Sequence, residues 1–158
     1  MKRARKFTYV FIVLTSFLLG LIPSYASTSR IVALLPSLAE MVTDLGSKAK
    51  LVGVPEYTSI GEPQQIVNLG PYPNVSIEKI VALRPDLVLI SKEGAKRELV
   101  EALAKLNIKT DVLALSTLRE VAATARHLAE ILGASNLSKV LQLEQIVKKG
   151  SKSRCSKP

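Results

Sequence analysis

The sequence predicts an α/β domain of three layers, a Rossmann-like lobe in which four or five mostly parallel strands form a sheet with helices on both faces. Segments typical of strands alternate four times with segments typical of helices. Each predicted strand is a continuous apolar run, as is typical of a parallel sheet buried on both faces. With 158 residues, the chain is long enough for one such domain.

The first two predicted strands flank a helix. Residues 30–35 (RIVALL) and 51–54 (LVGV) are short apolar runs of the kind that buried strands show. Between them, Ser37 and Glu40 have the spacing of a capping box, in which each side chain binds a free backbone N–H of the first helical turn. We therefore expect a helix to begin at Ser37 and to be closed by Gly46.

A long irregular loop is predicted next, at residues 55–74, because this stretch holds four prolines and two glycines. A short extended piece is expected within it at residues 66–69. Loops of this length in compact domains are usually functional, so this loop is a first candidate for a binding site.

Four helices and two strands complete the predicted domain. Ser76 is the expected N-cap of a short helix, and residues 86–90 (DLVLI) form the next apolar strand. The remaining elements are a helix at 95–106, a strand within 108–115, a helix opened by the capping box of Thr117 and Glu120 and closed by Gly133, and a helix at 137–147. The polar, basic residues 148–158 are expected to be a disordered tail.

The net charge of +9 lies at the two ends of the chain. Residues 27–147 hold 13 basic and 13 acidic side chains, so the predicted domain has no basic face for a nucleic acid. A single cysteine, Cys155, excludes an intramolecular disulfide, and a single histidine, His127, excludes a three-histidine metal site. We expect no metal and no cofactor.

The first 26 residues have the order of a cleavable signal peptide. A basic segment (residues 1–6) precedes sixteen largely apolar residues (7–22), and small residues end at Ala26. The apolar run is shorter than the roughly 20 residues of a spanning helix, which disfavours the alternative of an uncleaved anchor. We expect cleavage after Ala26, a periplasmic location and no stable membrane anchor.

The motifs of common catalytic and nucleotide sites are absent. The chain has no GxGxxG, GxxxxGK[ST] or G-x-S-x-G sequence, so Ser37 is interpreted as a helix cap rather than a nucleophile. A small secreted α/β enzyme remains an alternative, although it needs a nucleophile or metal cluster that the sequence lacks. We predict no catalytic residue and no enzymatic activity.

Three segments carry a family resemblance. RIVALLPSLAE (30–40), LVGVPEY (51–57) and SIEKIVALRPDLVLI (76–90) resemble the N-terminal lobe of class III periplasmic solute-binding proteins. Those proteins are the receptors of ABC importers for cobalamin, ferric siderophores and haem, and the likeness is greatest to the cobalamin-binding, BtuF-like type. The resemblance implies a receptor for a small-molecule ligand of one of these kinds that works with an ABC transporter permease.

The resemblance covers only one of the family's two lobes. It implies an N-terminal lobe at residues 27–134 and the start of the helix between the lobes at 135–147. The family pattern then stops, so we expect the C-terminal lobe to be missing through a frameshift, a premature stop or a split gene. A non-functional truncated product is therefore a second alternative.

The resemblance also implies site residues. Tyr57 and Tyr72 match ligand-facing aromatic positions, and Glu78 matches a glutamate that docks on arginines of the permease. Pro36 and Ser37 join the ligand-binding set because they follow the first strand, and ligands of open parallel sheets bind beyond the carboxyl ends of strands. Alternatives stay open: Tyr72 as a turn residue that packs on its own loop, and Glu78 as an exposed acid near a helix N-terminus.

Overall fold

The computed structural model describes residues 28–61, 65–134 and 136–155, so the predicted signal peptide lies outside the described residues. A five-stranded parallel sheet in the order β3-β2-β1-β4-β5 forms the centre of the domain, which confirms the predicted fold class. The strands are β1 (Ile31–Ala33), β2 (Leu51–Val54), β3 (Val67–Asn68), β4 (Leu87–Ser91) and β5 (Thr110–Leu113). The short extended piece predicted at residues 66–69 is β3.

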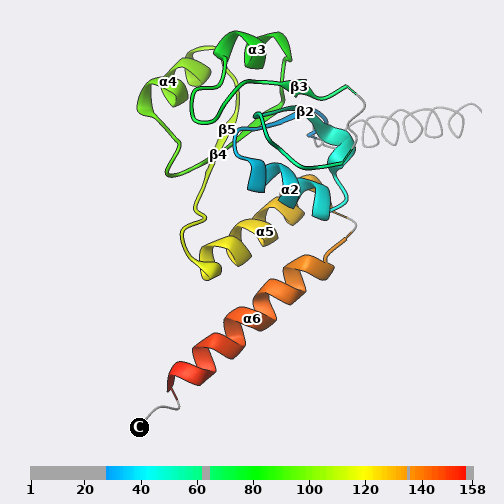
Figure 1. Cartoon of the computed structure of the whole chain (residues 1–158), viewed down its shortest axis with the longest axis vertical. Helices are drawn as coiled ribbons and strands as arrows, with labels where there is room; N and C mark the ends of the chain where they lie inside the picture. The colour runs from blue at the N-terminus through cyan, green and yellow to red at the C-terminus, as the bar shows by residue number, and fades with distance from the viewer. Residues whose placement is uncertain (1–27, 62–64, 135, 156–158) are drawn as a thin grey trace, which may run out of the picture.

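Helices cover both faces of the sheet, as Figure 1 shows. One layer consists of α2 (Pro36–Asp44) and α5 (Leu118–Leu132), with α6 (Ser138–Cys155) packed against α5. The other layer consists of α3 (Ile77–Ala82) and α4 (Arg97–Lys105), and a 3₁₀ turn, η1 (Lys48–Lys50), leads into β2.

Successive strand residues point to opposite faces and build two separate cores. In β1, Ile31 packs with the α2 and α5 layer, whereas Val32 packs with the α3 and α4 layer. In β4, Leu89 joins the first core and Ile90 the second, and all four side chains are fully buried. Both faces therefore need apolar side chains, which explains why the strands are continuous apolar runs.

Asp86 and Arg30 anchor the chain where it enters β1. One carboxylate oxygen of Asp86 accepts hydrogen bonds of 2.9 Å from the backbone N–H of Ser29, the Ser29 hydroxyl and the backbone N–H of Arg30. The Arg30 guanidinium donates to the carbonyl of Leu83 at 2.7 and 3.0 Å. The bonds from Ser29 lower the pKa of Asp86 because they stabilise its charged form.

Two of the predicted N-terminal helix caps are confirmed and one is wrong. Thr117 and Glu120 form a complete capping box, and the Ser76 side chain accepts from the backbone N–H of Lys79. The expected box of Ser37 and Glu40 does not form, because α2 begins earlier, at Pro36, without a side-chain cap. Proline at the first helical position has the helical φ angle and no N–H in need of a partner, so the helix starts there without Ser37.

The last helix is longer than the sequence predicts. α6 continues through Cys155, so residues 148–155 are helical where a disordered tail is predicted. Lysine is a good helix former, and Lys148 and Lys149 follow directly after Val147, which favours extension of the helix past that residue. The second half of α6 extends away from the domain (Figure 1). Within the described ranges, no helix is both long and apolar enough to cross a membrane.

Candidate functional site

The loops that follow the five strands meet at one edge of the sheet, because all strands are parallel. β1 leads into Pro36 and Ser37, β2 into the loop of Tyr57, and β3 into the loop of Tyr72. β4 ends at Ser91, and Ser116 follows β5. We define this carboxyl edge as the candidate functional site.

Tyr57 lies in the loop after β2 and is exposed over 87% of its surface. Its backbone is left-handed, with a φ of +63°, a conformation that costs a non-glycine residue about 1–2 kcal/mol. Two hydrogen bonds flank it: the Thr58 hydroxyl donates to the Pro55 carbonyl at 2.6 Å, and the Glu56 N–H donates to the Gly70 carbonyl at 2.9 Å. The loop therefore holds a strained aromatic residue out to solvent, which is typical of a binding position.

Tyr72 lies in the neighbouring loop and contacts the end of β4. Its hydroxyl shares a hydrogen bond of 3.1 Å with the hydroxyl of Ser91, which is buried. The Ser91 oxygen also accepts from the backbone N–H of Gly94 at 3.1 Å. Tyr72 is half-buried, and its hydroxyl contacts a residue outside its own loop, at the end of β4.

The loop after β4 also contacts the loop after β5. The Ser116 hydroxyl donates a hydrogen bond to the Glu93 carboxylate, and this bond is the main cause that lowers the pKa of Glu93. The end of β4 thus contacts Tyr72 through Ser91, and the loop that follows contacts Ser116 through Glu93. Neither contact is visible in the sequence.

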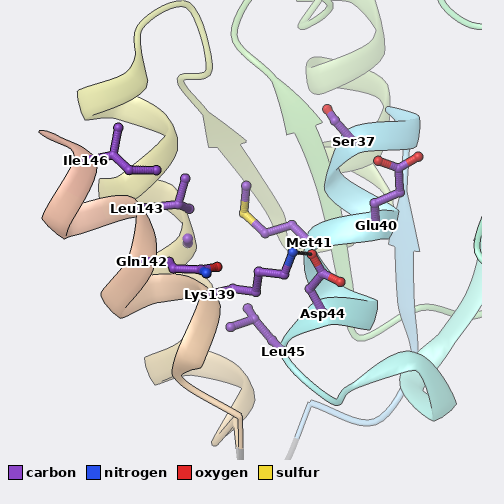
Figure 2. A pocket seen from close by; sticks show the side chains of 10 residues that line it. Ser37, Glu40, Met41, Asp44, Leu45, Lys139, Gln142, Leu143 and Ile146 are labelled. Carbon is purple, nitrogen blue, oxygen red and sulfur yellow. Dashed lines mark ion pairs between the residues drawn. The ribbon is translucent and has the colours of Figure 1, made fainter.

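Pro36 and Ser37 form the first turn of α2. Pro36 is half-buried, and exposed Ser37 is one of ten residues that line a groove of about 250 Å³ between α2 and α6 (Figure 2). Met41 from α2 and Leu143 from α6 extend into the groove, and Lys139 pairs with Asp44 across it at 3.7 Å. Neither Tyr57 nor Tyr72 lines this groove.

Glu78 lies in the first turn of α3 and is exposed. Its own backbone N–H and the Ser76 hydroxyl, which donates at 2.8 Å, lower its pKa and keep it ionised. Beside it, Ile77 lines a second groove of about 330 Å³, which extends to Pro73 and to the start of α4 at Lys96. Glu78 therefore presents a negative charge at the start of α3, beside Ile77, whose groove extends to the loop of Tyr72.

The described residues of this edge offer aromatic and hydroxyl groups. Two ring systems suit contact with a flat or bulky apolar ligand, and the serine hydroxyls and backbone amides suit hydrogen bonds to its polar rim. The sequence predicts the positions of Tyr57 and Tyr72 at this edge, but not that Ser91 and Gly94 enclose the end of the Tyr72 side chain. The only signal for that pair is their position directly after an apolar strand.

Comparison with known proteins assigns the fold to a family. A family model described as "Periplasmic binding protein" matches residues 31–147, which is most of the chain. The chain is 29% identical over 123 residues to the vitamin B12-binding protein of Pectobacterium atrosepticum, with 77% of this chain and 44% of that protein aligned.

Solved structures give the same result. The periplasmic vitamin B12 binding protein BtuF of Vibrio cholerae superposes with a TM-score of 0.68 and 25% identity, over 82% of this chain and 52% of that one. A periplasmic heme binding protein from Pseudomonas aeruginosa superposes with a TM-score of 0.60 and 26% identity, over 80% of this chain and 44% of that one. The chain thus spans about half the length of these relatives, and it belongs to the periplasmic binding protein family.

Proposed function

We propose that this chain is the substrate-binding component of an ABC importer for cobalamin or a related corrinoid or iron chelate, including siderophores and haem. In this proposal the carboxyl edge is one wall of the ligand site, and the chain catalyses no reaction. The relatives that support it are named for vitamin B12 binding and heme binding. We also propose that residues 1–26 direct export to the periplasm, where the family's members act, and are removed after Ala26.

One observation carries the proposal. Tyr57 and Tyr72 are the only aromatic residues after residue 26, and both lie in loops at the carboxyl edge rather than in either core. A hydrogen bond between Glu56 and Gly70 joins these two loops. The cores are packed with aliphatic side chains, so neither aromatic ring is needed for core packing. Both rings lie at one edge, where they can contact a large planar ligand.

A titration tests this proposal. We expect equilibrium dialysis to detect cyanocobalamin or haemin binding with a dissociation constant above about 10 μM, because an open edge covers one face of a ligand whereas tight pockets bury about 70–90% of it. Tyr57→Ala and Tyr72→Ala should each weaken binding about three- to tenfold, the value of one aromatic contact.

Leu106→Ala is the matched control, because Leu106 is an exposed apolar residue at the opposite end of α4. It should leave the dissociation constant unchanged. Equal affinity of the native chain and both tyrosine variants for every ligand tested would contradict the proposal.

The same proposal assigns Glu78 to the permease interface. Glu78→Arg should weaken binding to the membrane complex of the importer about three- to tenfold at low salt, because an exposed charge acts on steering and orientation. The effect should fade above 0.1 M salt, where the Debye length is about 10 Å. Surface plasmon resonance with the importer in nanodiscs measures both the dissociation constant and its dependence on salt.

Glu130→Arg provides the charge-matched control, since Glu130 is an exposed helical glutamate on α5, in the other helical layer. If the two reversals weaken binding equally, net charge rather than Glu78 accounts for the effect, and Glu78 is removed from the interface.

A further inference from the structure

The hydroxyl end of Tyr72 contacts the end of β4 and the loop that follows it. Ser91 contacts it through the 3.1 Å hydrogen bond between the two hydroxyl oxygens. Gly94 lies so close that a side chain there would overlap the tyrosine hydroxyl and approach its Cζ to 2.6 Å and its Cε2 to 2.9 Å. The ring is therefore held at its polar end by one hydrogen bond and one tight contact.

Ser91 is a rigid partner for this hydrogen bond. It is the last residue of β4, paired in register with Leu113 of β5, and only 2% of its surface is exposed. Its hydroxyl accepts from the Gly94 N–H at 3.1 Å, which occupies one acceptor site and leaves the hydroxyl proton and a second lone pair for Tyr72 and the neighbouring Glu93 carboxylate. A buried hydroxyl that loses a partner pays a desolvation cost, which favours the state in which Tyr72 stays docked.

Position 94 needs a glycine because there is no room for a side chain, and not because of its backbone conformation. Its φ is not in the left-handed region, unlike those of Gly61, Gly70 and Gly133. An alanine backbone would fit here, and the three atoms nearest to its Cβ all belong to the Tyr72 side chain. The residue that contacts the end of the Tyr72 side chain is therefore one without a side chain of its own.

We propose that Ser91 and Gly94 are positioning residues for ligand recognition: they hold the Tyr72 ring in one orientation before the ligand arrives. This inference rests on the proposed function of the carboxyl edge. A tyrosine that is ordered in the free protein loses little rotational freedom on binding, and the ordering cost of one mobile side chain corresponds to about two- to tenfold in dissociation constant. The ligand touches Tyr72, and Ser91 and Gly94 act through it.

The first test is independent of any ligand. In the full chain with Tyr9→Phe, Tyr25→Phe and Tyr57→Phe, Tyr72 is the sole tyrosine, and no tryptophan interferes with its emission. Ser91→Ala should raise the acrylamide quenching constant of Tyr72, because a released ring is more accessible. Ser116→Ala, which removes the hydroxyl bonded to Glu93 in the same loop cluster, should leave it unchanged.

The second test measures affinity for cyanocobalamin and haemin by equilibrium dialysis, in the chain with its native tyrosines. Ser91→Ala should weaken binding about three- to tenfold, the value of one hydrogen bond. In a Tyr72→Phe background, which already lacks the hydrogen bond, Ser91→Ala should have no further effect. This non-additivity separates positioning through Tyr72 from a general structural role.

The outcomes distinguish the two claims. If Tyr72→Ala weakens binding but Ser91→Ala changes neither quenching nor affinity, the positioning role is overturned and the proposed function stands. If Ser91→Ala raises quenching while no tyrosine variant alters binding, Tyr72 is held as described but does not contact the ligand, which overturns both the positioning role and the proposed ligand wall.

Discussion

Replacing Leu89 with alanine is expected to lower the free energy of unfolding by about 3–5 kcal/mol. Leu89 lies in β4, one strand from the sheet edge, and is fully buried in the core that α2 and α5 cover. The substitution removes buried apolar surface and leaves a cavity that the surrounding strands cannot fill. Domains of this size are stable by about 5–15 kcal/mol, so the change uses up a large part of the total.

Urea unfolding followed by circular dichroism measures this effect as a lower midpoint with an unchanged slope. Leu141→Ala is the matched control, because Leu141 lies on α6 with 55% of its surface exposed and leucine and alanine have similar helix propensities. Equal losses for the two variants would mean that β4 is not at the centre of the core.

Replacing Gly94 with alanine is expected to destabilise the domain by about 1–3 kcal/mol, the usual cost of overpacking a tight site. The added Cβ would overlap the Tyr72 hydroxyl, so the ring has to leave its place beside Ser91. In a Tyr72→Ala background these overlapping atoms are gone, and the same substitution should cost much less. The double-mutant cycle therefore isolates the contact between residues 94 and 72.

Gly150→Ala is the control for a general effect of removing a glycine. A Cβ at Gly150 would meet nothing within 4 Å, and alanine is a better helix former, so this variant should be neutral or slightly stabilising. A Gly94→Ala cost that persists in the Tyr72→Ala background would show that the glycine is needed for another reason.

Periodicity and composition predict the architecture well because both reflect burial. The apolar runs of β1 and β4 place side chains into two cores at once, and that pattern is visible in the residues themselves. The capping box of Thr117 and Glu120 is likewise a local interaction, and it forms as predicted. The box predicted at Ser37 fails because Pro36 competes for the same helix start, and the pattern alone does not rank the two signals.

The candidate site is predicted only in outline. The sequence places Tyr57 and Tyr72 in loops after strands, and the parallel sheet brings these loops to one edge. The partners of Tyr72 lie 19 and 22 positions further along the chain, at Ser91 and Gly94, and no local pattern links them. The same limit applies to the bond from Ser116 to Glu93, because such contacts depend on how neighbouring loops pack.

The most direct measurement of the central claim is a map of where a corrinoid contacts the protein. In a titration of the ¹⁵N-labelled chain with diamagnetic cyanocobalamin, we expect amide shifts to change around Glu56 to Thr58, at Tyr72 and from Ser91 to Gly94. Amides at the opposite edge, such as Leu106, should keep their shifts. Changes confined to α6 or to the edge of Leu106, with the loops of Tyr57 and Tyr72 unaffected, would contradict the assignment of the carboxyl edge as the ligand wall.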